Sequence, residues 1–437
     1  MNQTEPDKPK LGGLSLLPLF TFLLIYMSAG IWFSYHGHQM AFYQFPAPSC
    51  AFFGFFVALI IGYKNLHYHI NNFIDGIGNN TVILMCLIFL LAGAFSSLTQ
   101  ATGSVDSTVN LGLYLLPDNL LLPGLFLISC FISFSMGTSM GTISTIIPIA
   151  LGLSQSLNLH LPLVAATVIG GAMFGDNLSV ISDTTIAATG TQGCQMKEKM
   201  AVNVRIAFPA AVLVFALLFF AGGGESQAHV GDFSLIKILP YALVLALAVF
   251  GVHVVIILSA GIVAAIFIGL VCENFQIIEV GKIIYDGFIS MTDVFLVTFL
   301  IAGLAAIASK EGGIEFLLKK LSPLAIGKKS AQAVIAVCVA ITDICIANNT
   351  VAILFSGPIA KKLADKFAIQ PGKTASILDV FSCVLQGVIP HGAQILLAGG
   401  LCQISGFDIL PYSYYPALLA LFAIVDIIFM SNKKYAD

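Results

Sequence analysis

Residues 174–185 read Phe-Gly-Asp-Asn-Leu-Ser-Val-Ile-Ser-Asp-Thr-Thr, a polar run inside an apolar stretch that extends from 161 to 190. An apolar stretch of about twenty residues is long enough to cross a bilayer as a helix. The run would carry Asp176 and Asp183 to membrane depth, where an ionised group costs at least ~2.5–3.5 kcal/mol on insertion scales. We therefore expect a broken helix here, with its irregular backbone buried in protein or lining a wet cavity.

The composition around this run is that of a membrane protein. Of the 437 residues, 58% are hydrophobic and 9% are charged, against about 45–50% and 25% in soluble domains. The net charge of −3 and the single arginine, Arg205, exclude a nucleic-acid-binding protein, which needs a basic face. The nine cysteines show no Cys/His metal spacing. The sequence predicts an all-α polytopic membrane protein that contacts the lipid bilayer and needs no cofactor.

Ten apolar stretches are predicted to span the membrane, and two further stretches are interrupted midway. The interrupted stretches are 120–150 and 331–360, with polar breaks near Gly137 and Asn348. Two of the ten are also broken, at the run quoted above and at 390–392 (Pro-His-Gly). The predicted spans are 12–33, 46–63, 80–99, 161–190, 206–222, 237–256, 257–271, 288–309, 374–400 and 411–430.

The two halves of the chain repeat at an offset of 210 residues. Residues 89–93 align with 299–303, and in the same ungapped register the polar break at 137–140 meets the break at 347–350. Gly103 also aligns with Gly313, and residues 148–150 align with 358–360 (Pro-Ile-Ala in both). Three short matches at one offset, with the breaks superposed, are poorly explained by chance. We expect two repeats, each with five spans and one interrupted segment, over residues 1–235 and 236–437.

The basic residues predict how these repeats sit in the membrane, since Lys and Arg gather in cytoplasmic loops. No basic residue flanks 120–150, whereas nine of the nineteen lie between Lys310 and Lys373, on both sides of 331–360. Both flanks of each interrupted segment thus share a side, which predicts two re-entrant hairpins that enter from opposite faces, and hence inverted repeats. The residues that place both termini, the end of the second span and the loop before 206 in the cytoplasm are Lys8, Lys10, Lys64, Lys197, Lys199, Arg205, Lys433 and Lys434.

Inverted repeats whose broken helices meet near the midplane are the plan of secondary transporters. The oxygen-bearing side chains at the breaks suit a small hard cation, and a carboxylate there can take a proton when the cation leaves. The predicted cation- and proton-binding residues, with Asp176 and Asp183 as the Na⁺ ligands, are Asp176, Asn177, Ser179, Ser182, Asp183, Thr184, Asp343, Asn348, Asn349 and Thr350. The candidate substrate-binding residues are Thr138, Ser139, Thr185, Gln386 and His391.

Other ionisable groups in the apolar stretches have simpler interpretations. Asp293 and Asp379 fit helix-end or interhelical hydrogen bonds, and Asp426 is expected to extend to the cytoplasmic interface. His391 is as well explained by a satisfied core histidine as by a group that titrates near neutral pH.

Residues 137–141 match the G-x-S-x-G pattern of serine hydrolases. The repeat argues against a nucleophile, because the equivalent of Ser139 is Asn349, which cannot perform that chemistry. We expect no enzyme. Paired hairpins also favour alternating access over the continuous pore of a channel.

Residues 175–185 resemble the NhaC-type sodium/proton antiporter family, whose signature is close to G-D-N-x-S-x-x-S-D-T-T and is matched completely here. The 390–392 Pro-His-Gly also fits a pattern of the second repeat. The resemblance implies the fold of the ion-transporter superfamily, with a scaffold that often dimerises and a moving domain that contains both hairpins. It implies Na⁺/H⁺ antiport by alternating access in the cytoplasmic membrane, by a homodimer.

The alternative is a Na⁺- or H⁺-coupled transporter of an amino acid or small organic acid, because members and relatives of the family also carry such substrates. No arginine lies in any hairpin or break, so the bidentate clamp that suits a dicarboxylate is missing. A zwitterionic amino acid would still be able to use helix N-termini for its carboxylate.

Overall fold

The computed structural model describes residues 11–36, 38, 44–115, 118–180, 182–221 and 232–429. Helices take up 86% of these residues, and no strand occurs among them. Lys8, Lys10, Lys433 and Lys434, on which the predicted side of the termini depends, lie outside the described residues. The α-helices are α1 (Leu17–Tyr35), α2 (Ala47–Ile61), α3 (Leu66–Ile77), α4 (Asn80–Ala101), α5 (Ser104–Leu115), α6 (Asp118–Met136), α7 (Ser139–Leu157), α8 (Leu161–Leu178), α9 (Asp183–Gln192), α10 (Met196–Ala221), α11 (Leu235–Val249), α12 (Val254–Val271), α13 (Ile277–Ser290), α14 (Thr292–Lys310), α15 (Gly313–Leu321), α16 (Lys328–Ile346), α17 (Asn349–Lys366), α18 (Pro371–Gln386), α19 (Ala393–Cys402), α20 (Gly406–Ile409) and α21 (Tyr414–Phe429).

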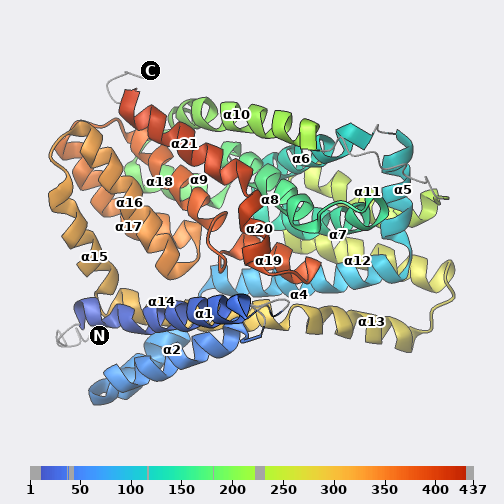
Figure 1. Ribbon diagram of the computed structural model, residues 1–437, viewed down its shortest axis with the longest axis horizontal. Helices are drawn as coiled ribbons and strands as arrows, with labels where there is room; N and C mark the ends of the chain where they lie inside the picture. The colour runs from blue at the N-terminus through green and yellow to red at the C-terminus, as the bar shows by residue number, and fades with distance from the viewer. Residues whose placement is uncertain are drawn as a thin grey trace, which may run out of the picture.

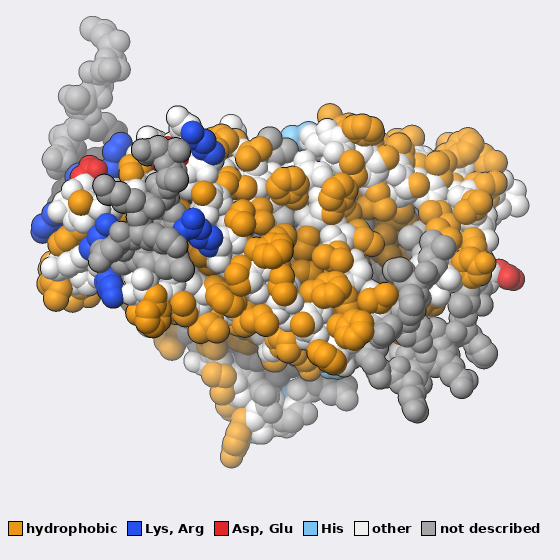
Figure 2. Space-filling view, turned by 90° about the horizontal axis from the view of Figure 1, so that it is seen from above, with side chains coloured by type: hydrophobic (Ala, Val, Ile, Leu, Met, Phe, Trp, Pro, Cys, Tyr) orange, Lys and Arg blue, Asp and Glu red, His pale blue; other side chains and the backbone are white. Residues whose placement is uncertain are grey.

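Eight of the described helices are long and apolar enough to cross a membrane, or up to ten if each of two bent pairs is one span. Figure 2 shows hydrophobic side chains over the middle of one face, while Lys and Arg gather at the end where Figure 1 places α15. This distribution is that of a band facing lipid with charge in the adjoining water. The prediction of an all-α polytopic membrane protein is confirmed.

The helix bounds recur at the 210-residue offset. Helices α6 and α16 end at Met136 and Ile346, and α7 and α17 begin at Ser139 and Asn349, so each interrupted segment is broken where the sequence predicts. Gly137 and Ala347 open the two breaks in the left-handed region, with φ of 67° and 52°. Helices α8 and α18, and likewise α9 and α19, begin 210 residues apart. The inversion of the repeats across the membrane stays a prediction.

Four short helices were not predicted from the sequence, because they have polar residues among the apolar ones and are too short to span a bilayer. They are α3, α5, α13 and α15. The prediction was also wrong about the segment before 206, which is not a loop. Helix α10 begins at Met196, and Lys199 lies within it with no exposed surface.

The helices form two parts that meet at α4 and α14. In Figure 1, α1, α2, α13 and α14 form the lower layer, and the helices that flank the breaks, α6–α9 and α16–α19, lie above them. Helix α4 packs against α7 and α19, and α14 packs against α16 and α19. The breaks therefore lie close to the surface that the upper part presents to α4 and α14.

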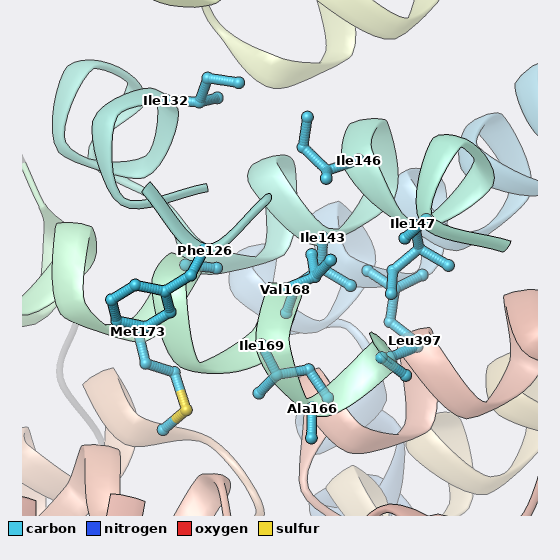
Figure 3. Packing of buried hydrophobic residues seen from close by; sticks show 14 of the residues in the cluster. Phe126, Ile132, Ile143, Ile146, Ile147, Ala166, Val168, Ile169, Met173 and Leu397 are labelled. Carbon is cyan, nitrogen blue, oxygen red and sulfur yellow. The ribbon is translucent and has the colours of Figure 1, made fainter. Parts of the chain in front are cut away.

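The core beside the break between α8 and α9 is built by α6, α7, α8 and α19. Figure 3 shows Phe126, Ile143, Val168 and Leu397 from these helices around one buried apolar cluster. Gly171 and Gly175 lie one turn apart on α8, where a Cβ atom would overlap the Phe126 and Cys130 carbonyl oxygens of α6. Small residues of this spacing allow membrane helices to pack backbone to backbone. The contact fixes α8 up to the residue before Asp176.

Candidate functional site

Four helices begin at one cavity of about 80 Å³. They are α7, α9, α17 and α19, two from each predicted repeat, and the cavity lies where the breaks interrupt their helices. Helix N-termini present free amide donors and a partial positive charge. The cavity is lined by Thr81, Leu84, Met85, Ile88, Thr138, Ser139, Met140, Asp176, Asp183, Thr184, Asn348, Asn349, Thr350, Ala393 and Gln394.

Two carboxylates face this cavity. Asp176 is 8% exposed, and its Oδ2 accepts a hydrogen bond of 3.3 Å from the Ser139 amide, while its buried Oδ1 has no hydrogen-bond partner in the protein. Asp183 Oδ2 accepts a hydrogen bond of 2.7 Å from the Thr350 hydroxyl of the other repeat. Because Asp176 Oδ1 accepts no hydrogen bond and the exposed Asp183 carboxylate lines the same cavity, the two have the donor chemistry that a hard monovalent or divalent cation prefers.

Among the described residues, no group of three or more His, Cys, Asp or Glu side chains is placed so that it could hold a metal ion. The cavity instead mixes two carboxylates with hydroxyl, amide and backbone groups. Such a set has low negative charge, which suits a cation that is bound and released rather than one held permanently.

The structure brings eight of the predicted site residues to the cavity. Two of them also shape helix starts, because Asn348 Oδ1 accepts from the Val351 amide at 3.0 Å and Thr138 Oγ1 accepts from the Gly141 amide at 3.5 Å. The eight residues are Thr138, Ser139, Asp176, Asp183, Thr184, Asn348, Asn349 and Thr350.

Four predicted residues of the break between α8 and α9, which we call the first break, do not line the cavity. Asn177 Nδ2 donates to the Tyr415 hydroxyl at 3.2 Å, and Ser182 Oγ shares a hydrogen bond of 2.9 Å with Thr184 Oγ1. The Thr185 hydroxyl donates to the Ser179 carbonyl oxygen at 2.9 Å. These groups hold the shape of the break from the side that faces the protein.

A second polar cluster lies beside the break between α18 and α19, which we call the second break. It consists of Asp343, Gln386 and His391. Asp343 has no exposed surface, and its Oδ1 accepts from Gln386 Nε2 at 2.9 Å. Gln386 Oε1 in turn accepts from the Ala393 amide at 2.8 Å, and His391 Nε2 donates to the Ile344 carbonyl oxygen at 3.0 Å. Asp343 is thus connected through Gln386 to Ala393, the first residue of α19, which lines the cavity.

Three neighbouring cavities lie in a row from the site towards the protein surface, and they share Asn348 as a lining residue. Asn348 lines the 80 Å³ cavity, a neighbouring cavity of about 20 Å³ that His391 also lines, and a third of about 190 Å³. The third cavity reaches Asp75 and Lys310, whose carboxylate and ammonium form an exposed ion pair at 2.5 Å. Since α14 ends at Lys310 and α15 follows, the row points towards the basic end of the molecule seen in Figure 2.

Sequence reading missed two residues at the site. Gln394 is 3% exposed and donates to the Ser139 hydroxyl at 3.1 Å. The repeat offers a signal for it, because Gln394 lies 210 residues after Thr184. The second missed residue is Lys199, whose ammonium forms an ion pair of 2.8 Å with Asp379. In the sequence, the indication that Lys199 is buried is a second polar residue, Asn203, which lies four positions later and so on the same face of a helix.

The remaining acidic residues of the apolar stretches have structural partners or lie exposed. Asp379 makes the interhelical contact that was one of its expected interpretations, and Asp293 is exposed in the first turn of α14. The expectation for Asp426 was wrong. It is 6% exposed and pairs with the ammonium of Lys373, itself 3% exposed, so it does not extend to the interface.

The chain matches the model of a family described as the Na⁺/H⁺ antiporter family over residues 13–223 and 227–431. It is 27% identical over 384 residues to the Na⁺/H⁺ antiporter NhaC of Bacillus subtilis, covering 78% of this chain and 83% of that one. It is 25% identical over 307 residues to the malate-2H⁺/Na⁺-lactate antiporter of the same organism, covering 65% of this chain and 63%, just under two thirds, of the relative. The arginine/ornithine antiporter ArcD of Halobacterium salinarum is 22% identical over 476 aligned positions, which cover 99% of this chain and 94% of the relative.

Proposed function

The chain belongs to the Na⁺/H⁺ antiporter family, and on that premise we propose that it exchanges Na⁺ for H⁺ at the cavity where the four helices begin. The resemblance read from residues 175–185 is confirmed by the family match, and the protein is a membrane-embedded secondary transporter, not an enzyme.

Asp176 and Asp183 carry the proposal. Both line the cavity, but only Asp176 is buried: its Oδ1 has no hydrogen-bond partner, so leaving this carboxylate ionised without a counter-charge is costly. Asp183 is exposed, and its oxygens accept from the Thr184 amide and the Thr350 hydroxyl. A bound Na⁺ or a bound proton relieves that cost, and the two compete because they use the same oxygens. If the carrier changes its access only when this charge is neutralised, each Na⁺ that leaves must be replaced by protons.

The remaining predicted ligands surround this pair. Thr184, Asn349 and Thr350 supply oxygens at the cavity, and Asp343 completes the site indirectly through Gln386. Asn177, Ser179 and Ser182 support the break through backbone and side-chain contacts. Thr138, Ser139 and Gln394 form the side of the cavity at the start of α7.

Access to the site changes when the hairpin-bearing helices move past α4 and α14. The row of cavities that ends at Asp75 and Lys310 is the proposed route on the cytoplasmic side, because the basic end of the molecule is the cytoplasmic end by the positive-inside rule. In this arrangement both termini are cytoplasmic, the protein is in the cytoplasmic membrane, and it assembles as a homodimer through its scaffold.

Purified protein in liposomes tests this function. An outward Na⁺ gradient is expected to acidify the lumen, reported by a trapped pH-sensitive dye, whereas an equal choline gradient is not. Uptake of labelled amino acids or lactate driven by Na⁺, without proton movement, would instead make the protein a symporter. Unitary currents in a planar bilayer would make it a channel.

A further inference from the structure

Lys199 is a lysine with no exposed surface, inside helix α10. Its ammonium has three hydrogen atoms and three partners: Asp379 Oδ2 at 2.8 Å, the Asn177 carbonyl oxygen at 3.1 Å and Thr185 Oγ1 at 2.6 Å. A buried ammonium is strongly unfavourable unless it is paired and its donors are used. Here all three donors are used, and nothing in the proposed Na⁺ cycle requires this charge.

The partners of Lys199 lie on the two sides of the first break. Asn177 follows Asp176 and belongs to the last turn of α8, while Thr185 lies two residues after Asp183 in the first turn of α9. Carbonyl groups in the last turn of a helix have no partner within the helix and interact favourably with a cation. One ammonium therefore bridges the break next to both carboxylate-bearing residues.

Asp379 and Asn203 fix the ammonium in place. Asp379 is on α18, in the other predicted repeat, and is 1% exposed. Asn203 Nδ2 donates to Asp379 Oδ2 and to the Asn177 carbonyl oxygen, both at 2.8 Å. The break is thus connected through three side chains to α10 and α18, which are themselves continuous helices on either side of these residues.

The second break is held differently. There Gln386, at the end of α18, accepts from the Ala393 amide at the start of α19, so a neutral side chain spans the gap. Gln386 lies 210 residues after Asp176, and the first repeat therefore has a carboxylate where the second has this bridging amide. Asp176 faces the cavity and accepts from the Ser139 amide, so its side chain does not bridge the first break. Another group is needed there.

We propose that Lys199 is a positioning residue of the transport site, which holds the break between α8 and α9 so that Asp176 and Asp183 face one cavity. Its consequence for Na⁺ affinity rests on the proposed function, whereas its effect on the break does not. Removal of Lys199 leaves both carboxylates in the chain but releases the segment that sets their separation.

The test removes the charge pair with isosteric side chains, in Lys199→Met/Asp379→Asn, so that neither buried charge is left alone. The matched control is Lys373→Met/Asp426→Asn, because that pair is also a buried lysine and aspartate but joins α18 to α21. Amide hydrogen exchange of the purified proteins is followed by mass spectrometry in peptides that cover 176–189. Na⁺-driven proton flux in liposomes gives the apparent KM for Na⁺.

We expect amide exchange in these peptides to rise at least tenfold in the Lys199 variant and to stay unchanged in the control. The apparent KM for Na⁺ is expected to rise about tenfold or more, with a smaller change in maximal rate. Unchanged exchange in the Lys199 variant would overturn the bridging role, whether or not the protein moves Na⁺. Faster exchange with an unchanged KM would overturn the positioning role, while absence of Na⁺/H⁺ exchange in the wild type would contradict the proposed function alone.

Discussion

Asp176→Asn is expected to reduce Na⁺-driven proton flux in liposomes to the level of protein-free vesicles. The amide removes the negative charge and the group that takes the proton, so neither ion has its full binding site. The variant keeps the shape of the side chain and an oxygen that can accept the hydrogen bond from the Ser139 amide. We therefore expect it to fold, with an unchanged elution profile in detergent.

Asp293→Asn is the matched control for this variant. It also exchanges a carboxylate for an amide in a terminal turn of a helix, but Asp293 is exposed and does not line the proposed site. Its flux is expected to equal that of the wild type. Wild-type flux in Asp176→Asn would contradict the assignment of Asp176 to the ion site. Loss of flux in both variants would show that the assay reports damage to the protein as a whole.

Gly175→Val is expected to give the largest loss of stability among single substitutions at the first break. A Cβ atom at Gly175 would overlap the Cys130 carbonyl oxygen and the Phe134 amide nitrogen, which are backbone atoms and cannot rotate away. Overpacking of this kind costs about 1–3 kcal/mol and occasionally more. Because α8 and α6 must separate, Asp176 is displaced as well, and we expect transport to be lost. The apparent Tm of the purified protein is expected to fall by roughly 5 °C or more.

Gly281→Val separates this packing effect from the general cost of a β-branched residue in a helix. Gly281 lies within α13, and nothing lies within 4 Å of a Cβ atom built there. Its apparent Tm is expected to stay within about 2 °C of the wild type. Equal Tm values for the two variants would contradict the close packing of α6 against α8.

The breaks were predictable from the sequence because their signals are local and repeated. Polar residues at 137–140 and 347–350 interrupt apolar runs, and the 210-residue offset shows that both interruptions belong to one plan. A chain that must satisfy its backbone in lipid cannot tolerate such residues except at a protected break. The structure places helix ends at Met136 and Ile346, as this reasoning requires.

The direction of side chains at a break was not predictable from spacing. Asp176 and Asn177 are neighbours in the sequence, yet one faces the cavity and the other donates to Tyr415. Once the helix ends, the 3.6-residue period no longer relates position to direction. The four residues assigned to the cation that do not line the cavity were chosen as oxygen-bearing residues at the breaks, and they are Asn177, Ser179, Ser182 and Asp343.

Counting basic residues in loops failed for Lys199 and Lys373. The rule assumes that charge lies outside the membrane, but both side chains are buried and each is paired with an aspartate far away in the sequence. Such pairing depends on which helices meet, here α10 with α18 and α18 with α21, and the sequence pattern does not contain that information. The orientation inferred from the remaining basic residues does not depend on these two.

Proton release on Na⁺ binding tests most directly whether one site serves both ions. Purified wild-type protein in weakly buffered detergent solution is mixed with NaCl near neutral pH, and a pH dye records the protons released; choline chloride is the control. We expect Na⁺ to release protons in proportion to the protein, and Asp176→Asn to release fewer or none. Na⁺ binding that raises the apparent Tm without releasing any proton would contradict competition at a shared pair of carboxylates.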